Sequence, residues 1–216
     1  MASEDINPAQ VKAHSEQLIL QAGGRVCDWL PTIERQQPRG QADLIGRALV
    51  LNALVNIAFS APISAIKNWI DANGLAAHLS QGERDLLRKQ NEDISEQQKS
   101  DLEWSIEALW ALMWAGGLIP DLPVDTHVAD TMVTLVPDLQ KNEDGEKFTQ
   151  RMRLRSYAEL YQMLDLYYRA HWYTEDGRIN GYDTADISSD IVMERRKALE
   201  WLLDASSDWD NISLNT

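Results

Sequence analysis

The chain has 216 residues, 44% of them apolar and 25% charged, and its 34 acidic and 20 basic side chains give a net charge of −14. This is the composition of a globular protein long enough to bury a sizeable core, not that of a disordered chain. The single cysteine excludes a disulfide scaffold and a cysteine-only metal site. A pI near 4.6 argues against nucleic-acid binding, which needs clustered Lys and Arg. We expect a cytoplasmic protein.

Apolar residues recur at helical spacing along nearly the whole chain. The predicted helices cover residues 8–22, 41–59, 62–73, 96–115, 127–136, 146–153, 157–174 and 190–204. Capping boxes, in which a serine is followed three residues later by Glu or Gln, mark three helix starts. These are Ser80/Glu83, Ser95/Gln98 and Ser156/Glu159, and the second of them opens the helix that we expect to be the longest.

Residues 25–40 read as a connector because prolines and a polar run interrupt them, and at most a minor short strand is expected near residues 26–30. The fold class predicted is all-α, a single compact orthogonal helical domain of about eight helices. Residues 1–40 supply an N-terminal helix and connector that pack on the main domain, and residues 41–216 form that domain.

Residues 48–66 lack charge over nearly the length of a membrane span. Asn52, Asn56 and Ser60 interrupt the segment at a spacing of four, which draws one polar stripe along a helix, and Pro62 then breaks the helix. In lipid these amides would lack partners, whereas in a protein core they can bond to neighbouring loops. The segment is therefore predicted to be the central core helix, and no membrane association is expected.

The negative charge is concentrated in two parts of the chain. No Lys or Arg lies between Lys99 and Lys141, where seven acids occur, and the segment after residue 155 is also strongly acidic. Such fields speed association with cationic partners, so a basic protein partner is predicted; the alternative is that the acidity serves solubility. The candidate binding residues are Asp121, Asp125, Asp130, Asp204, Asp208 and Asp210.

Seven blocks from the tryptophan helix to the C-terminal region occur in a characteristic order. They are WSIEALW (104–110), WAGGL (114–118), RLR (153–155), DLYYRAHW (165–172), RING (178–181), ERRKALEWL (194–202) and WD (209–210). In this order the chain, from about residue 47 to its end, resembles a bacterial family catalogued as domain of unknown function 4272. The resemblance implies no established activity, and it associates the family with secreted-toxin systems.

One polar cluster offers two interpretations. Its members are Asp165, Arg169, His171, Arg178, Glu194 and Arg195. Asp165 and Arg169 lie four apart and can pair on one helix. If Glu194 reached His171 it could fix the imidazole tautomer and create a general base, so a hydrolase-like enzyme would use His171, Glu194 and Asp165. The favoured interpretation is a structural ion network that sets helix register and in which Glu107 pairs with Arg153 or Arg155.

Other polar groups have simpler explanations. Asp125, His127 and Asp130 include a His-x-x-Asp spacing that could bind a metal, but Asp125 is explained as a helix N-cap and no third ligand is evident. Cys27 has an acidic neighbour that disfavours a thiolate. No nucleophile elbow, phosphate loop or dinucleotide fingerprint is present. We therefore expect neither metal nor cofactor. The function predicted is that of a non-catalytic acidic interaction protein, of the immunity or antitoxin type, that masks a basic protein partner; the alternative is the enzyme just described.

Overall fold

The computed structural model of the protein describes residues 6–184 and 186–216, and within them it is all-α, with helices and no strand. The α-helices are α1 (Pro8–Gln21), α2 (Gln41–Ala58), α3 (Ile63–Ala72), α4 (Gln81–Leu86), α5 (Glu96–Ala115), α6 (Glu146–Arg151), α7 (Tyr157–Asn180) and α8 (Ser189–Leu203). Short 3-10 turns are η1 (Ala76–His78), η2 (Asn91–Asp93), η3 (Asp130–Thr134), η4 (Leu139–Lys141) and η5 (Trp209–Asn211).

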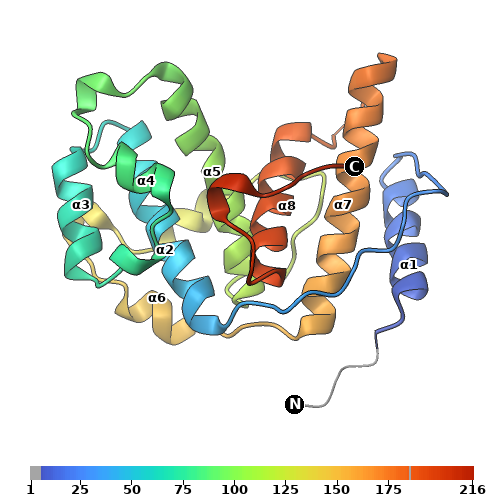
Figure 1. Ribbon diagram of the computed structural model, residues 1–216, viewed down its shortest axis with the longest axis horizontal. Helices are drawn as coiled ribbons and strands as arrows, with labels where there is room; N and C mark the ends of the chain where they lie inside the picture. Colours follow the sequence, from blue (N-terminus) through green and yellow to red (C-terminus); the bar gives the residue numbers. More distant parts are fainter. Residues whose placement is uncertain (1–5, 185) are drawn as a thin grey trace.

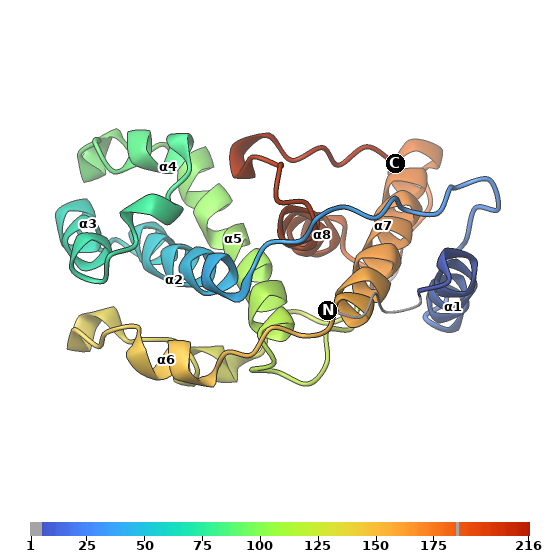
Figure 2. The ribbon, with the colours of Figure 1, turned by 60° about the horizontal axis from the view of Figure 1, so that its bottom comes forward.

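Six helices pack side by side in an order that differs from their order in the chain. Each of the neighbours in the series α3, α2, α5, α8, α7, α1 contacts the next, and Figure 1 shows this series from left to right. Helix α5 therefore lies between α2 and α8. Turning the molecule shows α6 below this row and α1 at its outer end, against α7 (Figure 2).

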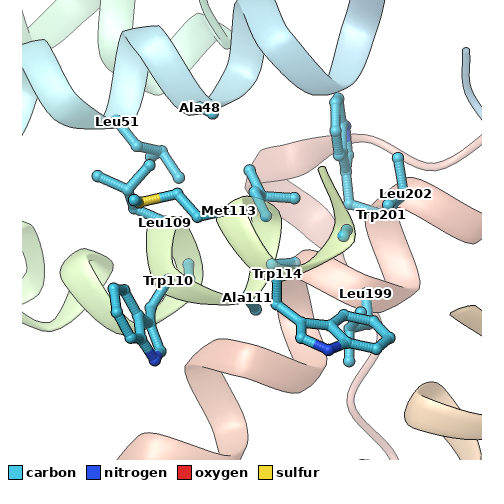
Figure 3. Close-up of a cluster of buried hydrophobic side chains, with 14 of the residues drawn as sticks. Ala48, Leu51, Leu109, Trp110, Ala111, Met113, Trp114, Leu199, Trp201 and Leu202 are labelled. Carbon is cyan, nitrogen blue, oxygen red and sulfur yellow. The ribbon is translucent and has the colours of Figure 1, made fainter. Parts of the chain in front are cut away.

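The core is centred on α5 because this helix is covered on both sides. Its residues from Glu107 to Ala115 are all buried. Figure 3 shows Leu51 of α2 facing Leu109 and Met113 of α5, while Leu199 and Leu202 of α8 lie on the other side. A helix enclosed in this way has to be apolar around its whole circumference. Glu107 is the exception, and its burial requires a partner.

The predicted helix starts are confirmed, since all three capping boxes are formed by Ser80, Ser95 and Ser156 with their partners. The predicted bond between the polar stripe of α2 and a neighbouring loop is present, because Asn52 Nδ2 donates to the carbonyl oxygen of Pro137 at 3.2 Å. Within the described residues, no helix is long and apolar enough to cross a membrane.

Two expectations were wrong. The longest helix is α7, with 24 residues against 20 for α5, because it continues past Thr174 and ends only at Gly181, which caps it in the left-handed conformation. Residues 127–136 form no α-helix and contain only the 3-10 turn η3. The amide of Val128, just before this turn, donates to the buried Glu107 carboxylate and so holds the backbone in an irregular path. At most a minor short strand was expected in residues 26–30, and they contain none. Lys12 Nζ donates to the carbonyl oxygens of Asp28 and Leu30, and the segment contains a turn.

Candidate functional site

The segment between α5 and α6, residues 116–145, contains no α-helix and carries the acids that the sequence singles out. Asp121, Asp125 and Asp130 are exposed on it. Between them, Leu122 and Val124 are buried and fix the segment to the core. We call residues 118–134 the acidic loop. A connection of this length is usually either functional or disordered, so what holds it in place matters.

Arg195 of α8 is the main anchor of the acidic loop. Its side chain is fully buried, and its guanidinium pairs with the Glu107 carboxylate, with Nη2 2.7 Å from Oε2. The remaining N–H groups donate to the loop backbone, from Nη1 to the Pro123 oxygen at 2.8 Å and from Nη2 to the Thr126 oxygen at 2.7 Å. Glu107 in turn accepts from the Val128 amide at 3.1 Å. Both members of this buried pair therefore bind the loop.

Two further side chains extend this attachment. Arg155 donates from Nε to the Trp114 oxygen at 2.7 Å and from Nη2 to the Ile119 oxygen at 3.0 Å. The Tyr167 hydroxyl contacts the Leu122 and Pro123 oxygens, both at 3.3 Å. Burial raises the pKa of Tyr167 to about 12, so it remains a hydrogen-bond donor. Side chains of the core thus hold the backbone of the acidic loop. The carboxylates of the loop are not used for this attachment and face solvent.

The second predicted acidic group does not join the first. In Figure 2 the irregular segment after α5 lies at the bottom, whereas η5 lies at the top of the molecule. The acids near η5 also serve local structure: Asp208 caps η5, Asp204 accepts from Ser206, and Asp210 accepts from the Gly82 amide at 2.8 Å. Of the six predicted binding residues, the acidic loop therefore carries Asp121, Asp125 and Asp130 only.

His171, the proposed general base, lies in a different environment from the one that catalysis would need. It is 5% exposed, and its Nδ1 lies 2.8 Å from Nη1 of Arg196. Burial, together with the Arg196 charge, lowers the pKa of His171 to about 4. A neutral imidazole whose ring nitrogen faces a guanidinium is a hydrogen-bond acceptor in the core, and its low pKa makes it a weak base.

The partners expected for His171 are occupied or elsewhere. Asp165 binds Arg169 in a bidentate pair, at 2.9 and 2.8 Å, with both side chains buried. Glu194 is half-buried, and the charges that act on it are those of Lys197, Asp101, Asp190 and Glu107, whereas Arg196 and Glu175 act on His171. Burial raises the pKa of Glu194. This geometry disfavours a catalytic set of His171, Glu194 and Asp165.

The remaining members of the predicted network have local roles. Glu107 pairs with Arg195 and not with Arg153 or Arg155, because α8 rather than the segment after α6 packs on that part of α5. Arg153 Nη1 donates to the Met152 oxygen. Arg178 pairs with Glu175 on the surface at 2.6 Å, outside the buried network.

Two buried arginines were missed by the sequence reasoning. Arg196 is 3% exposed and links Glu200 and His171 to the C-terminal carbonyls of Leu214 and Asn215. Arg47, 1% exposed, pairs with Glu83 at 2.6 Å. The signals existed: Arg196 and Glu200 have i, i+4 spacing, and Arg47 stands alone at the start of an apolar helix.

Among the described residues, no three His, Cys, Asp or Glu side chains gather closely enough to hold a metal ion. Cys27 is buried and free.

Comparison with known proteins places the chain in a family. A family model described as a domain of unknown function (DUF4272) matches residues 11–212. The protein belongs to this family. The match extends further toward the N-terminus than residue 47, so the DUF4272 region includes the connector and nearly all of α1. No curated protein and no solved structure gives a significant match.

Breaking the Glu107–Arg195 pair of this DUF4272 protein should lower its free energy of unfolding far more than breaking an exposed ion pair. Glu107→Gln leaves the Arg195 charge buried without a counter-charge, so the free energy of unfolding in urea should fall by about 3–5 kcal/mol. The matched control is Asp71→Asn, which breaks the exposed Lys67–Asp71 pair, at 2.6 Å, and should cost less than about 1 kcal/mol. Equal losses in the two variants would contradict a special role for the buried pair.

His171 should make stability depend on pH in the acid range. Its pKa in the folded protein is about 4, below the ordinary value of 6.5, so the unfolded chain takes up the proton first. Its contribution to stability is therefore present above pH 6.5 and is lost as the pH falls toward 4, on the order of 3 kcal/mol in total. Burial raises the pKa values of Glu194 and Glu200, and these carboxyls act in the opposite direction.

The His171 contribution is isolated by comparing wild type with His171→Asn in urea unfolding at pH 7 and pH 4.5. Asparagine keeps an acceptor for Arg196 but does not titrate, so the stability difference between the two proteins should shrink at the lower pH. The control is His14→Asn, at an exposed histidine of α1. A difference that stays constant with pH would show that His171 is not held neutral.

Proposed function

We propose that this DUF4272 protein is a non-catalytic cytoplasmic binding protein, of the immunity or antitoxin type, whose acidic loop docks a basic protein partner. The observation that carries the proposal is the attachment of the acidic loop. Buried side chains hold its backbone in one path, and its carboxylates Asp121, Asp125 and Asp130 are exposed.

The rigidity of the loop supports binding in particular. A surface that is already ordered loses little conformational entropy when a partner docks, so more of the interaction energy appears as affinity. Functional residues are often placed on loops that a rigid scaffold positions. Three aspartates without an intervening Lys or Arg attract a basic partner and speed its encounter.

The polar interior supports a binding role over an enzymatic one. The buried Arg195 and Asp165 side chains are bonded to partners, and His171 faces a guanidinium. Groups engaged in this way stabilise the fold and are not available to move protons in a substrate. The enzyme alternative therefore has no observation of its own in its favour.

The test is a pull-down from the native host with the tagged full chain, washed at rising salt, followed by affinity measurement with the purified partner. Asp121→Lys, Asp125→Lys and Asp130→Lys combined should weaken binding of the basic partner at least a hundredfold, mainly through the association rate. His171→Asn should bind like wild type.

The matched control reverses three exposed acids elsewhere, Asp28, Glu92 and Glu103, to lysine. Both triple variants have the same net charge of −8, up from −14, so a non-specific charge effect would weaken both equally. A partner that is lost from both, or retained by the loop variant, would refute docking at the acidic loop.

A further inference from the structure

A cavity of about 650 Å³ lies away from the acidic loop. It opens between the C-terminal end of α2, helix α3 and η4, at the left of the molecule in Figure 2. We call it the α3 cleft. Its volume is within the range of small-molecule sites.

The lining of the α3 cleft is electrically neutral. It consists of Asn56, Phe59, Ser60, Ala61, Pro62, Ala65, Ile66, Asn68, Trp69, Ala72, Leu139, Gln140 and Asn142. At the chain's average of 25% charged residues, about three of these thirteen would be charged, yet none is. A charged ligand would find no counter-charge here, and the net charge of −14 further disfavours an anion.

Hydrogen-bonding groups nevertheless reach the cleft from several sides. Within the described residues, the side chains of Ser60, Asn68, Gln140 and Asn142 have no hydrogen-bond partner in the protein. Asn56 uses its Nδ2 to donate to the Asn52 oxygen at 2.7 Å, which leaves Oδ1 as an acceptor. Each free amide offers both donors and acceptors.

The walls of the cleft are fixed to one another. Trp69 Nε1 donates to the Glu143 oxygen at 2.8 Å, and Asn73 Oδ1 accepts from the Gly145 amide at 3.1 Å. With the Asn52 bond to Pro137, these contacts tie the segment around η4 to α2 and α3. The cleft is therefore preformed.

Two lining residues have a backbone conformation that favours glycine. In residues 6–184 and 186–216, the non-glycine residues with positive φ are Ser60, at 70°, and Asn142, at 53°. Both lie in the same cleft. Asn142 is the C-cap of η4, and Ser60 follows the C-terminal end of α2, a position where helices commonly adopt the left-handed conformation. The two caps place the polar side chains of Ser60 and Asn142 in one cavity.

The cleft also has an aromatic rim. Phe59 follows α2 and is 69% exposed, beside the buried apolar wall of Ile66 and Trp69. A ligand that fits must therefore be uncharged, carry hydrogen-bonding groups on several sides and present an apolar C–H face to the ring. Pyranose sugars combine these properties.

We propose that the α3 cleft binds a neutral saccharide, with hydroxyl groups bonded by Asn56, Ser60, Asn68, Gln140 and Asn142 and a sugar face against Phe59. This site goes beyond the proposed docking of a basic protein, because it shares no residue with the acidic loop.

The test is ligand-observed saturation-transfer NMR and calorimetry on the full chain with neutral disaccharides of glucose, galactose, mannose and N-acetylglucosamine. The decisive variant is Ser60→Gly with Asn142→Gly, since glycine suits both backbone positions and the protein should keep or raise its Tm. At least one disaccharide should bind wild type, and the double variant should bind it at least tenfold more weakly.

The matched control removes two exposed amides outside the cleft, Gln36→Ala with Gln162→Ala, and should bind like wild type. Adenosine, uridine and an uncharged hexapeptide are tested in parallel. Failure of every disaccharide to bind, equal binding by the glycine variant, or binding of a nucleoside or the peptide in place of the sugars would overturn the proposal.

Discussion

The buried Glu107–Arg195 pair is the interaction on which the described architecture depends most. Helix α5 is enclosed by α2 and α8, so a carboxylate on its buried stretch has to be neutralised from a neighbouring helix. Arg195 provides the charge, and its planar guanidinium has more N–H groups than one carboxylate can accept. The surplus donors bind carbonyls of the acidic loop. One ion pair thereby joins two core helices and determines the path of an otherwise irregular segment.

The same principle recurs where other irregular segments cross the helices. Arg39 binds the Trp201 oxygen, Arg169 the Pro31 oxygen and Arg196 the Leu214 and Asn215 oxygens. An all-α domain has no sheet ladder to satisfy the carbonyls of its connections, so these need water or side-chain donors. Buried arginines meet that need at points where a lysine, with three donors on a flexible stem, would hold fewer carbonyls. Their large number in a strongly acidic protein is then understandable, because they serve the backbone as much as the carboxylates.

The sequence predicted most of the helices but little of the site, and the reason is physical. Capping boxes and apolar periodicity are local, so Ser95 and the pattern of α5 placed that helix correctly. The Asp165–Arg169 pair was also predictable, since both residues lie on one helical turn. By contrast, Glu107 and Arg195 are 88 residues apart, and only the packing of α8 on α5 brings them together. Local spacing likewise could not separate the acids near η5 from those of the acidic loop, which lie on opposite sides of the molecule.

The distribution of bonded and free polar groups explains why binding is favoured over chemistry. The titratable groups of the interior are engaged: Asp165 with Arg169, Glu107 with Arg195, and His171 as a neutral acceptor for Arg196. The groups left free include exposed carboxylates on a fixed loop and neutral amides in a preformed cleft. The amides of the cleft do not titrate, so they offer hydrogen bonds and no proton transfer. Both kinds suit the recognition roles proposed above, since the loop and the cleft are ordered before a ligand arrives and binding does not have to order them.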